Sequence, residues 1–162
     1  HPFIKIGLDT SMRKTEILSI QRKDINLQQL VIYIPKAKAG AREQPITADL
    51  GEYLAAYVAT LRPGEQWLFP SPAAKDGRTV NLDKPFRRCV LAAGLDVKQV
   101  VRHTLRHTAI THLVQAGVDL PTVKRISGHK NLSMVERYSH QNGAHIQTAM
   151  DKLAERYKSG TS

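Results

Sequence analysis

Apolar side chains recur at helical spacing through most of this chain, in segments that end at glycine or proline. The clearest segment runs from Leu50 to Leu61 and ends at Pro63-Gly64. Later segments end at Gly94, Gly117 and Gly128. Because glycine readily adopts the left-handed backbone conformation that closes a helix, this punctuation predicts a succession of short helices. We expect helices over residues 15–20, 49–61, 83–93, 104–116, 119–126, 133–138 and 146–157.

One stretch has the composition of strands instead. Leu30 to Ile34 is rich in β-branched and aromatic residues, and a second short run extends from Glu43 to Thr47. The intervening residues, Pro35 to Ala41, include a glycine and two lysines. This pattern predicts a β-hairpin with a long basic loop. The expected fold is therefore mainly α with a small antiparallel β-sheet, an α+β domain.

The length and the cysteine content limit the class of protein. A chain of 162 residues fits one domain. Because the first residue is His1 rather than methionine, we expect residues 1–162 to be a fragment that lacks an upstream domain. Its apolar runs are shorter than the roughly 20 residues that cross a membrane. The single Cys89 excludes an internal disulfide and indicates a reducing compartment, so we expect a cytoplasmic protein.

The charge balance suggests the partner. Lysine and arginine number 24 against 14 acidic residues, which gives a formal net charge of +10. Such an excess favours binding to a polyanion, because basic side chains that neutralise phosphates release condensed counterions. Nucleic acid is the leading interpretation, and an enzyme that merely has a high isoelectric point is the alternative.

The densest group of polar residues lies near the C-terminal end. His103 and Arg106 are spaced to share one face of a helix, and His129 and Tyr138 follow. Arginine can bind two phosphoryl oxygens at once, and a tyrosine hydroxyl can attack phosphorus when its proton is removed. Zinc binding by His103 and His107 is less favoured, since no glutamate follows the first histidine as in HExxH.

Several short boxes in this order resemble the catalytic domain of tyrosine recombinases, the phage integrase family. They are Thr10-Ser-Met-Arg13-Lys-Thr-Glu16, Lys38-Ala-Gly40, His103-Thr-Leu-Arg106-His107, Gly128-His129 and Glu136-Arg-Tyr138. The resemblance extends from about Ile4 to about Tyr157. It implies the tyrosine recombinase catalytic-domain fold.

Roles for the matching residues follow from the resemblance. Arg13 and Arg106 would bind the scissile phosphate, and Tyr138 would be the nucleophile. Lys38 would protonate the leaving 5′ oxygen, with Lys36 as the alternative lysine, and His103 would be the acid/base histidine.

Three further residues receive supporting roles. His129 would hydrogen-bond the phosphate, and Glu16 would support the first arginine box. Lys36 and Arg42, both in the basic hairpin, are expected to contact DNA. Two positions depart from the family pattern: Ser11 stands where glycine is frequent, and Val135 stands where threonine is frequent.

The resemblance also implies an activity. We expect site-specific cleavage and rejoining of double-stranded DNA through a 3′-phosphotyrosine, as in an integrase encoded by a bacterium, phage or mobile element. No cofactor, metal ion or ATP is expected. The segment from Ile146 to Tyr157 would either pack on its own domain or join protomers into a homotetramer on DNA. The alternatives are a catalytically idle DNA-binding domain of this fold and a type IB topoisomerase-like relaxation activity. A fragment without the upstream domain should bind DNA weakly.

Overall fold

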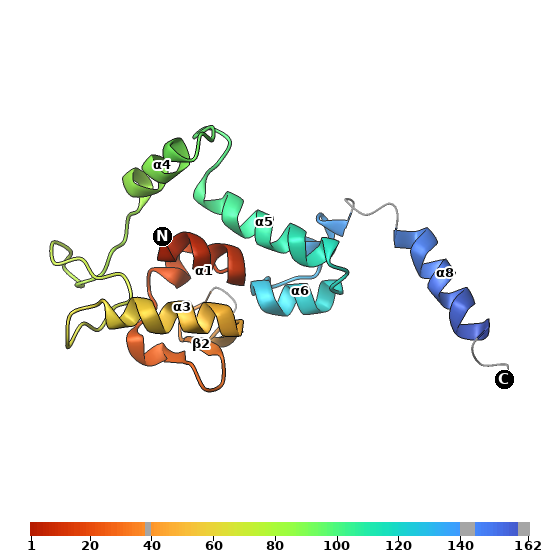
Figure 1. Ribbon diagram of the computed structural model, residues 1–162, viewed down its shortest axis with the longest axis horizontal. Helices are drawn as coiled ribbons and strands as arrows, with labels where there is room; N and C mark the ends of the chain where they lie inside the picture. The colour runs from red at the N-terminus through yellow and green to blue at the C-terminus, as the bar shows by residue number, and fades with distance from the viewer. Residues whose placement is uncertain (38–39, 140–144, 159–162) are drawn as a thin grey trace.

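The computed structural model describes residues 1–37, 40–139 and 145–158, and most of these residues are helical (Figure 1). The chain begins with helix α1 (Pro2–Thr10) and the short α2 (Lys14–Ile17). A turn of 3-10 helix, η1 (Arg22–Asp24), leads into the strands β1 (Ile25–Asn26), β2 (Val31–Ile34) and β3 (Arg42–Pro45). The remaining elements are α3 (Ala48–Ala59), α4 (Asp83–Ala92), α5 (Arg102–Gln115), α6 (Leu120–Ser127), α7 (Ser133–Glu136) and α8 (His145–Lys158). The expected fold class, mainly α with a small antiparallel sheet, is confirmed.

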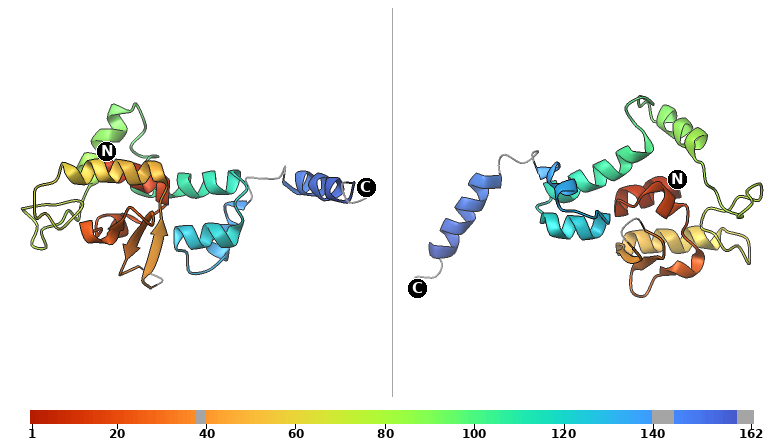
Figure 2. Two further views of the ribbon diagram at one scale, coloured as in Figure 1. Left: turned by 60° about the horizontal axis from the view of Figure 1, so that its bottom comes forward. Right: turned by 180° about the vertical axis from the view of Figure 1, so that it is seen from behind.

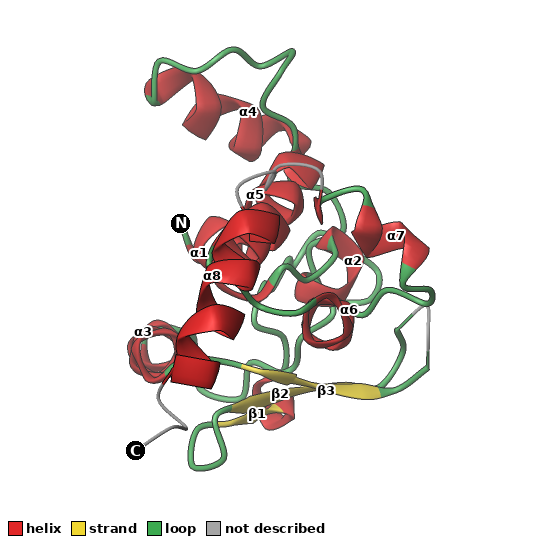
Figure 3. Ribbon diagram, turned by 90° about the vertical axis from the view of Figure 1, so that its right-hand side faces the viewer, coloured by secondary structure: helices red, strands yellow, loops and turns green. Residues whose placement is uncertain are grey.

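The three strands form one antiparallel sheet in the order β1-β2-β3. Ile32 of β2 pairs with Ile25 on one side and with Gln44 on the other. Figure 3 shows the strands together at one side of the molecule, with most of the helices on the other. The predicted hairpin is therefore present, and β1 adds a third strand that was not expected from the sequence.

The N-terminal part differs most from the sequence-based expectation. Helix α1 was not anticipated, although its buried residues Phe3, Ile6 and Thr10 lie at helical spacing. The helix expected to reach residue 20 ends at Ile17, because the chain then turns to pair with a distant loop. The backbone N–H of Leu68 donates to the carbonyl of Ile20 at 2.9 Å. A partner so far along the chain leaves no local signal.

Two hydrophobic clusters form the interior. The first gathers residues of α1, α2, β2, α3 and α4, with Ile6, Ile32 and Leu50 fully buried. The second is smaller and lies among α5, α6 and α7; it consists of Ile110, Val114, Val123, Val135 and Tyr138. Helix α5 belongs to both clusters, since its Leu105 packs in the first. This helix therefore connects the two halves of the interior.

Helix α8 lies apart from the rest of the molecule in Figures 1 and 2. Met150 and Leu153, two apolar residues of its predicted stripe, are 56% and 44% exposed. In the part of the chain that the structure describes, no helix is both long and apolar enough to cross a membrane.

Candidate functional site

A buried carboxylate organises the first part of the site. Glu16, at the end of the first turn of α2, has a side chain that is only 3% exposed. Its oxygens accept hydrogen bonds from the backbone N–H of Arg13 at 3.0 Å and from Nη1 of Arg13 at 3.1 Å. Nη2 of Arg42 donates to the same carboxylate at 3.3 Å. A buried charge must be paired, and these two arginines provide the pairing.

The same two arginines close the C-terminal end of α6. Nη2 of Arg13 donates to the carbonyl of Gly128 at 3.1 Å, and Nη1 of Arg42 donates to the carbonyl of Ile126 at 3.4 Å. Carbonyl groups at the end of a helix lack internal partners and carry partial negative charge. These contacts therefore bind α6 to α2 and to β3 with favourable electrostatics.

Arg106 of α5 lies at the centre of the site. Its buried guanidinium donates from Nη1 to the carbonyl of Ser11 at 2.5 Å, and Nη2 lies 3.1 Å from Nε2 of His129. Burial, and next the positive charge of Arg13, lower the pKa of Arg106 to about 10. The side chain remains charged at neutral pH. With three guanidinium groups around one carboxylate, the cluster carries an excess of positive charge that suits an anion such as phosphate.

The hydrogen bonds of His129 define its protonation. Because arginine has only donors, Nε2 of His129 accepts from Arg106, and the ring proton lies on Nδ1. Nδ1 lies 2.7 Å from the hydroxyl of Ser127, which donates to the carbonyl of Val123 at 2.7 Å. Burial, and next the charge of Arg106, lower the pKa of His129 to about 4. The imidazole is thus neutral at pH 7, and in this arrangement it orients Arg106.

Tyr138 belongs to the second hydrophobic cluster and is 7% exposed. Its hydroxyl oxygen lies 2.6 Å from Nδ1 of His107 and accepts from Nη2 of Arg137 at 3.2 Å. His107 follows Arg106 directly on α5, so one turn of this helix contacts both the arginine cluster and the tyrosine. A fixed hydroxyl with an adjacent imidazole is the arrangement that nucleophilic chemistry requires.

His103 lies one turn before His107 on α5, and it is exposed. It lines a pocket of about 240 Å³ together with Arg13 and Arg106. This pocket is the opening through which an anion could reach the two arginines.

The three basic hairpin residues with predicted roles differ in their positions in the structure. Lys38 lies outside the described residues. Lys36 is exposed, as a residue that contacts DNA must be. Arg42 is half-buried and bonded to Glu16 and Ile126, so its position gives it a structural part that the sequence did not indicate. Contact of Lys36 and Arg42 with DNA stays a prediction.

Three residues of the site were not singled out from the sequence as part of it. Ser11 was noted only as a departure from the family pattern, yet its carbonyl holds Arg106. His107 was considered only as a zinc ligand or a structural residue, and Arg137 was not assigned a role, yet both contact the hydroxyl of Tyr138. Ser11 has a positive φ of 55°, a backbone conformation that favours glycine, and this explains why glycine is frequent at this position in the family.

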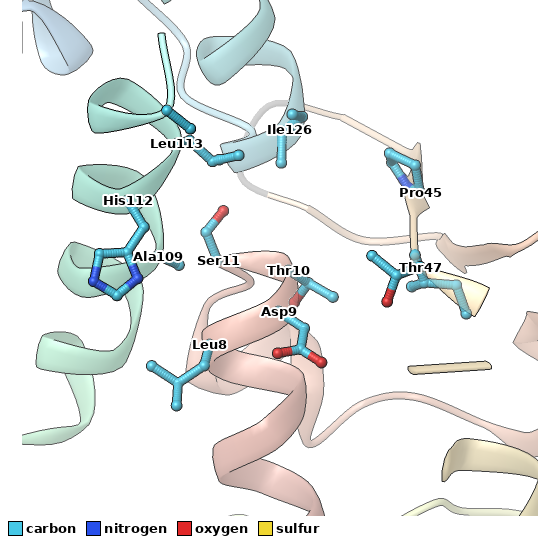
Figure 4. Close-up of a pocket in the computed structure, with 12 residues that line it drawn as sticks. Leu8, Asp9, Thr10, Ser11, Pro45, Thr47, Ala109, His112, Leu113 and Ile126 are labelled. Atoms are coloured by element: carbon cyan, nitrogen blue, oxygen red, sulfur yellow. The ribbon is translucent and has the colours of Figure 1, made fainter. Parts of the chain in front are cut away.

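A second, larger pocket lies between α1, α5, α6 and the end of β3 (Figure 4). Its volume is about 400 Å³, and its lining is mainly apolar, with residues such as Leu8, Leu113 and Ile126. His112 and Asp9 are among its polar lining residues. In the described residues, no group of three or more His, Cys, Asp or Glu side chains is placed to hold a metal ion.

Comparison with known proteins identifies relatives of this chain. The chain is 31% identical over 143 residues to the tyrosine recombinase XerD of Staphylococcus epidermidis, a match that covers 85% of this chain and 48% of the relative. The chain thus spans about half the length of the curated relatives it matches.

Solved structures have the same fold. A structure of the Tn1549 transposon integrase in complex with circular intermediate DNA matches with a TM-score of 0.79 at 21% identity, covering 94% of this chain and 59% of that chain. The XerH site-specific recombinase bound to palindromic difH substrate matches with a TM-score of 0.75 at 28% identity, covering 92% of this chain and 44% of that chain. The family model described as the phage integrase family matches residues 2–145. The chain therefore belongs to the phage integrase family of tyrosine recombinases.

Proposed function

We propose that this chain cleaves and rejoins DNA strands at specific sites through a covalent bond between Tyr138 and a 3′-phosphate. The observation that carries the proposal is that adjacent residues of helix α5 contact the arginine cluster and the tyrosine hydroxyl. Arg106 and His107 are adjacent on α5; Arg106 contacts His129, and His107 contacts Tyr138. A phosphate bound by Arg13 and Arg106 would lie near the nucleophile.

The reaction balances without a metal ion or ATP. The hydroxyl oxygen of Tyr138 forms a bond to phosphorus, and the bond from phosphorus to the 5′ oxygen breaks. The hydroxyl proton of Tyr138 passes to a neighbouring base, and Lys38 supplies the proton that the leaving 5′ oxygen needs. Arg13 and Arg106 stabilise the charge on the non-bridging oxygens, a role that fixed donors fill well in a preorganised site. The bond to tyrosine retains the energy of the phosphodiester, so rejoining needs no cofactor.

Double-stranded DNA is the proposed substrate. The net charge of +10 favours binding to a polyanion, and one structural relative is described as a complex with DNA and another as bound to its difH substrate. We further propose that α8 joins protomers into a homotetramer on DNA. Its exposed Met150 and Leu153 support this interpretation, since apolar side chains on a helix apart from the body are available for a partner.

Covalent capture tests the chemistry. The chain is incubated in EDTA with a pool of nicked duplexes whose short cleaved fragment diffuses away, and DNA-linked peptides are identified by mass spectrometry. We expect an adduct on Tyr138, and none from the Tyr138→Phe variant. Tyr33→Phe is the matched control, because Tyr33 is 47% exposed on strand β2 and should leave the adduct unchanged.

The alternatives predict different outcomes of this experiment. DNA binding without an adduct would indicate an idle DNA-binding domain. Relaxation of a supercoiled plasmid at low protein concentration, without preference for a site, would indicate topoisomerase-like activity. Cleavage by the Tyr138→Phe variant would contradict the assignment of the nucleophile.

A further inference from the structure

The hydroxyl of Tyr138 is held by two side chains outside the set that the family resemblance assigns. Nδ1 of His107 lies 2.6 Å from the hydroxyl oxygen, and Nη2 of Arg137 lies 3.2 Å from it. The imidazole and phenol rings are tilted by 35° with centroids 5.8 Å apart. The guanidinium of Arg137 lies over the phenol ring at 5.1 Å. The hydroxyl therefore has a defined position between a cation and an imidazole.

The surroundings of the hydroxyl indicate the direction of these hydrogen bonds. Arginine can only donate, so the hydroxyl oxygen of Tyr138 accepts from Arg137. The oxygen could also accept from His107, but a buried hydroxyl proton without an acceptor costs free energy, and Nδ1 of His107 lies within reach at 2.6 Å. This favours the arrangement in which Nδ1 accepts the tyrosine proton and the ring proton of His107 lies on Nε2.

The charges around His107 favour its neutral form. Its pKa is lowered from the ordinary value by burial and then by the charges of Arg137, His103 and Arg106. These three are the charged or titratable groups that lower its pKa, and Tyr138 is the titratable group in direct contact with it. His103, by contrast, lines the anion pocket with Arg13 and Arg106.

We propose that His107 takes the proton of Tyr138 when the hydroxyl attacks phosphorus, an inference that rests on the proposed function. The bond from oxygen to phosphorus forms, and the tyrosine proton moves to Nδ1 of His107. The electron pair of the broken bond stays on the 5′ oxygen, which Lys38 protonates. In the rejoining step His107 returns its proton to the tyrosine. His103 is thereby assigned to the phosphate pocket, and His107 to the nucleophile.

The first test needs no DNA and reads the hydrogen bond directly. Imidazole ¹⁵N spectra of the chain at pH 7 are recorded, and the His107 signals are assigned by their loss in His107→Asn. We expect Nδ1 of His107 to be unprotonated and Nε2 to carry the proton. A protonated Nδ1 at pH 7 would overturn the proposal, because the tyrosine proton could not move there.

The second test separates proton transfer from orientation. The side-chain oxygen of asparagine can occupy the place of Nδ1 and accept the hydrogen bond, but it cannot take up the proton. If His107 acts as the base, His107→Asn and His107→Phe both slow formation of the Tyr138 adduct by roughly 10²- to 10⁴-fold. Both variants also lose the fall in rate that protonation of His107 causes at acidic pH. His112→Asn, on the same helix but outside the arginine cluster, is the matched control.

The outcomes distinguish this inference from the proposed function. An adduct that forms at the normal rate in His107→Asn would mean that His107 only orients the tyrosine, and the proposal would be wrong while the function stands. If the unsubstituted chain forms no adduct, the proposed function fails, and the proton transfer that rests on it fails too. The nitrogen spectra then report only the hydrogen bond of the resting chain.

Discussion

At the scale of single residues, Ser11 shows how a backbone conformation serves the site. Its φ of 55° is in the left-handed region that favours glycine, and its buried hydroxyl lacks a hydrogen-bond partner. This conformation turns the carbonyl toward Nη1 of Arg106 at 2.5 Å. The strain at Ser11 therefore supports the orientation of an arginine that faces the proposed phosphate site.

Replacing Ser11 with glycine should stabilise the chain. Ser11→Gly relieves the left-handed strain and removes the unpaired hydroxyl, and the larger entropy of the unfolded glycine chain offsets part of this gain. We expect the free energy of unfolding in urea to rise by about 1 kcal/mol. Ser11→Ala, which keeps the strain, should gain less. Equal or lower stability of the glycine variant would contradict this explanation.

The neutral state of His129 makes stability depend on pH. Its pKa falls from an ordinary 6.5 to about 4 in the folded chain, so the unfolded chain binds a proton more readily. The stabilising contribution is complete above pH 6.5 and is lost progressively as the pH falls toward 4. His129→Gln can still accept from Arg106 but does not titrate. Thermal unfolding between pH 7 and 4 should therefore show a shallower loss in this variant, and parallel curves would exclude the effect.

Sequence alone indicated the residues whose chemistry is distinctive. Arg13, Arg106, His129 and Glu16 were expected to act together, and the structure pairs Arg13 with Glu16 and Arg106 with His129. The two pairs meet where Arg13 donates to the carbonyl of Gly128. The contacts of Ser11 and His107 could not be predicted, because they depend on a carbonyl direction and on how α5 packs against α7. Their part in catalysis stays a prediction, as does that of every residue in the cluster.

At the scale of elements, the end of α6 is a junction as well as a helix terminus. Gly128 closes the helix in the left-handed conformation, with a φ of 64°. A Cβ atom at this position would lie 2.7 Å from Nε of Arg42. The glycine thus serves both the helix end and the close approach of β3.

Gly128→Ala should be more harmful than an alanine at a similar helix end. We expect it to lower the free energy of unfolding by about 2–4 kcal/mol, because the backbone strain is joined by displacement of a buried, paired arginine. Gly94→Ala is the matched control, since Gly94 has a φ of 70° with open space around it. That change should cost about 1 kcal/mol. Equal losses in the two variants, measured by urea unfolding, would mean that Arg42 moves freely.

Helical periodicity and glycine punctuation predicted the long helices, and β-branched and aromatic composition predicted the hairpin, because these features are local in the sequence. They failed for α1 and for the end of α2. The four residues of α2 are too few to show a period, and the chain leaves the helix at Ile17 to pair with a loop that contains Leu68. Such pairings between distant segments are set by the tertiary fold.

At the scale of the whole molecule, α8 differs from the body, the described residues 1–139, in how its apolar side chains are buried. The body is built on two hydrophobic clusters, whereas Met150 and Leu153 of α8 are largely exposed. Exposed apolar residues on a helix apart from the body are typical of a surface that binds a partner.

Removing residues 145–162 should abolish assembly on DNA and leave the stability of the body nearly unchanged. We expect the free energy of unfolding of the body to change by less than about 0.5 kcal/mol, as for other changes at exposed positions. Complexes with several protomers on DNA, measured by sedimentation, should be lost. A large loss of stability would show that α8 packs on its own domain in solution.

Helix α5 also sets the spacing between the proposed phosphate site and the nucleophile. Leu105 is anchored in one cluster and Ile110 in the other, and Arg106 and His107 lie between them. Because successive residues of a helix differ by about 100° in direction, one inserted residue here would turn the imidazole away from Tyr138 while Arg106 stayed in place. A tilt of the helix would move both side chains together. Under the proposed function, the length of this one turn of α5 is therefore fixed, whereas the loops of the molecule can vary in length.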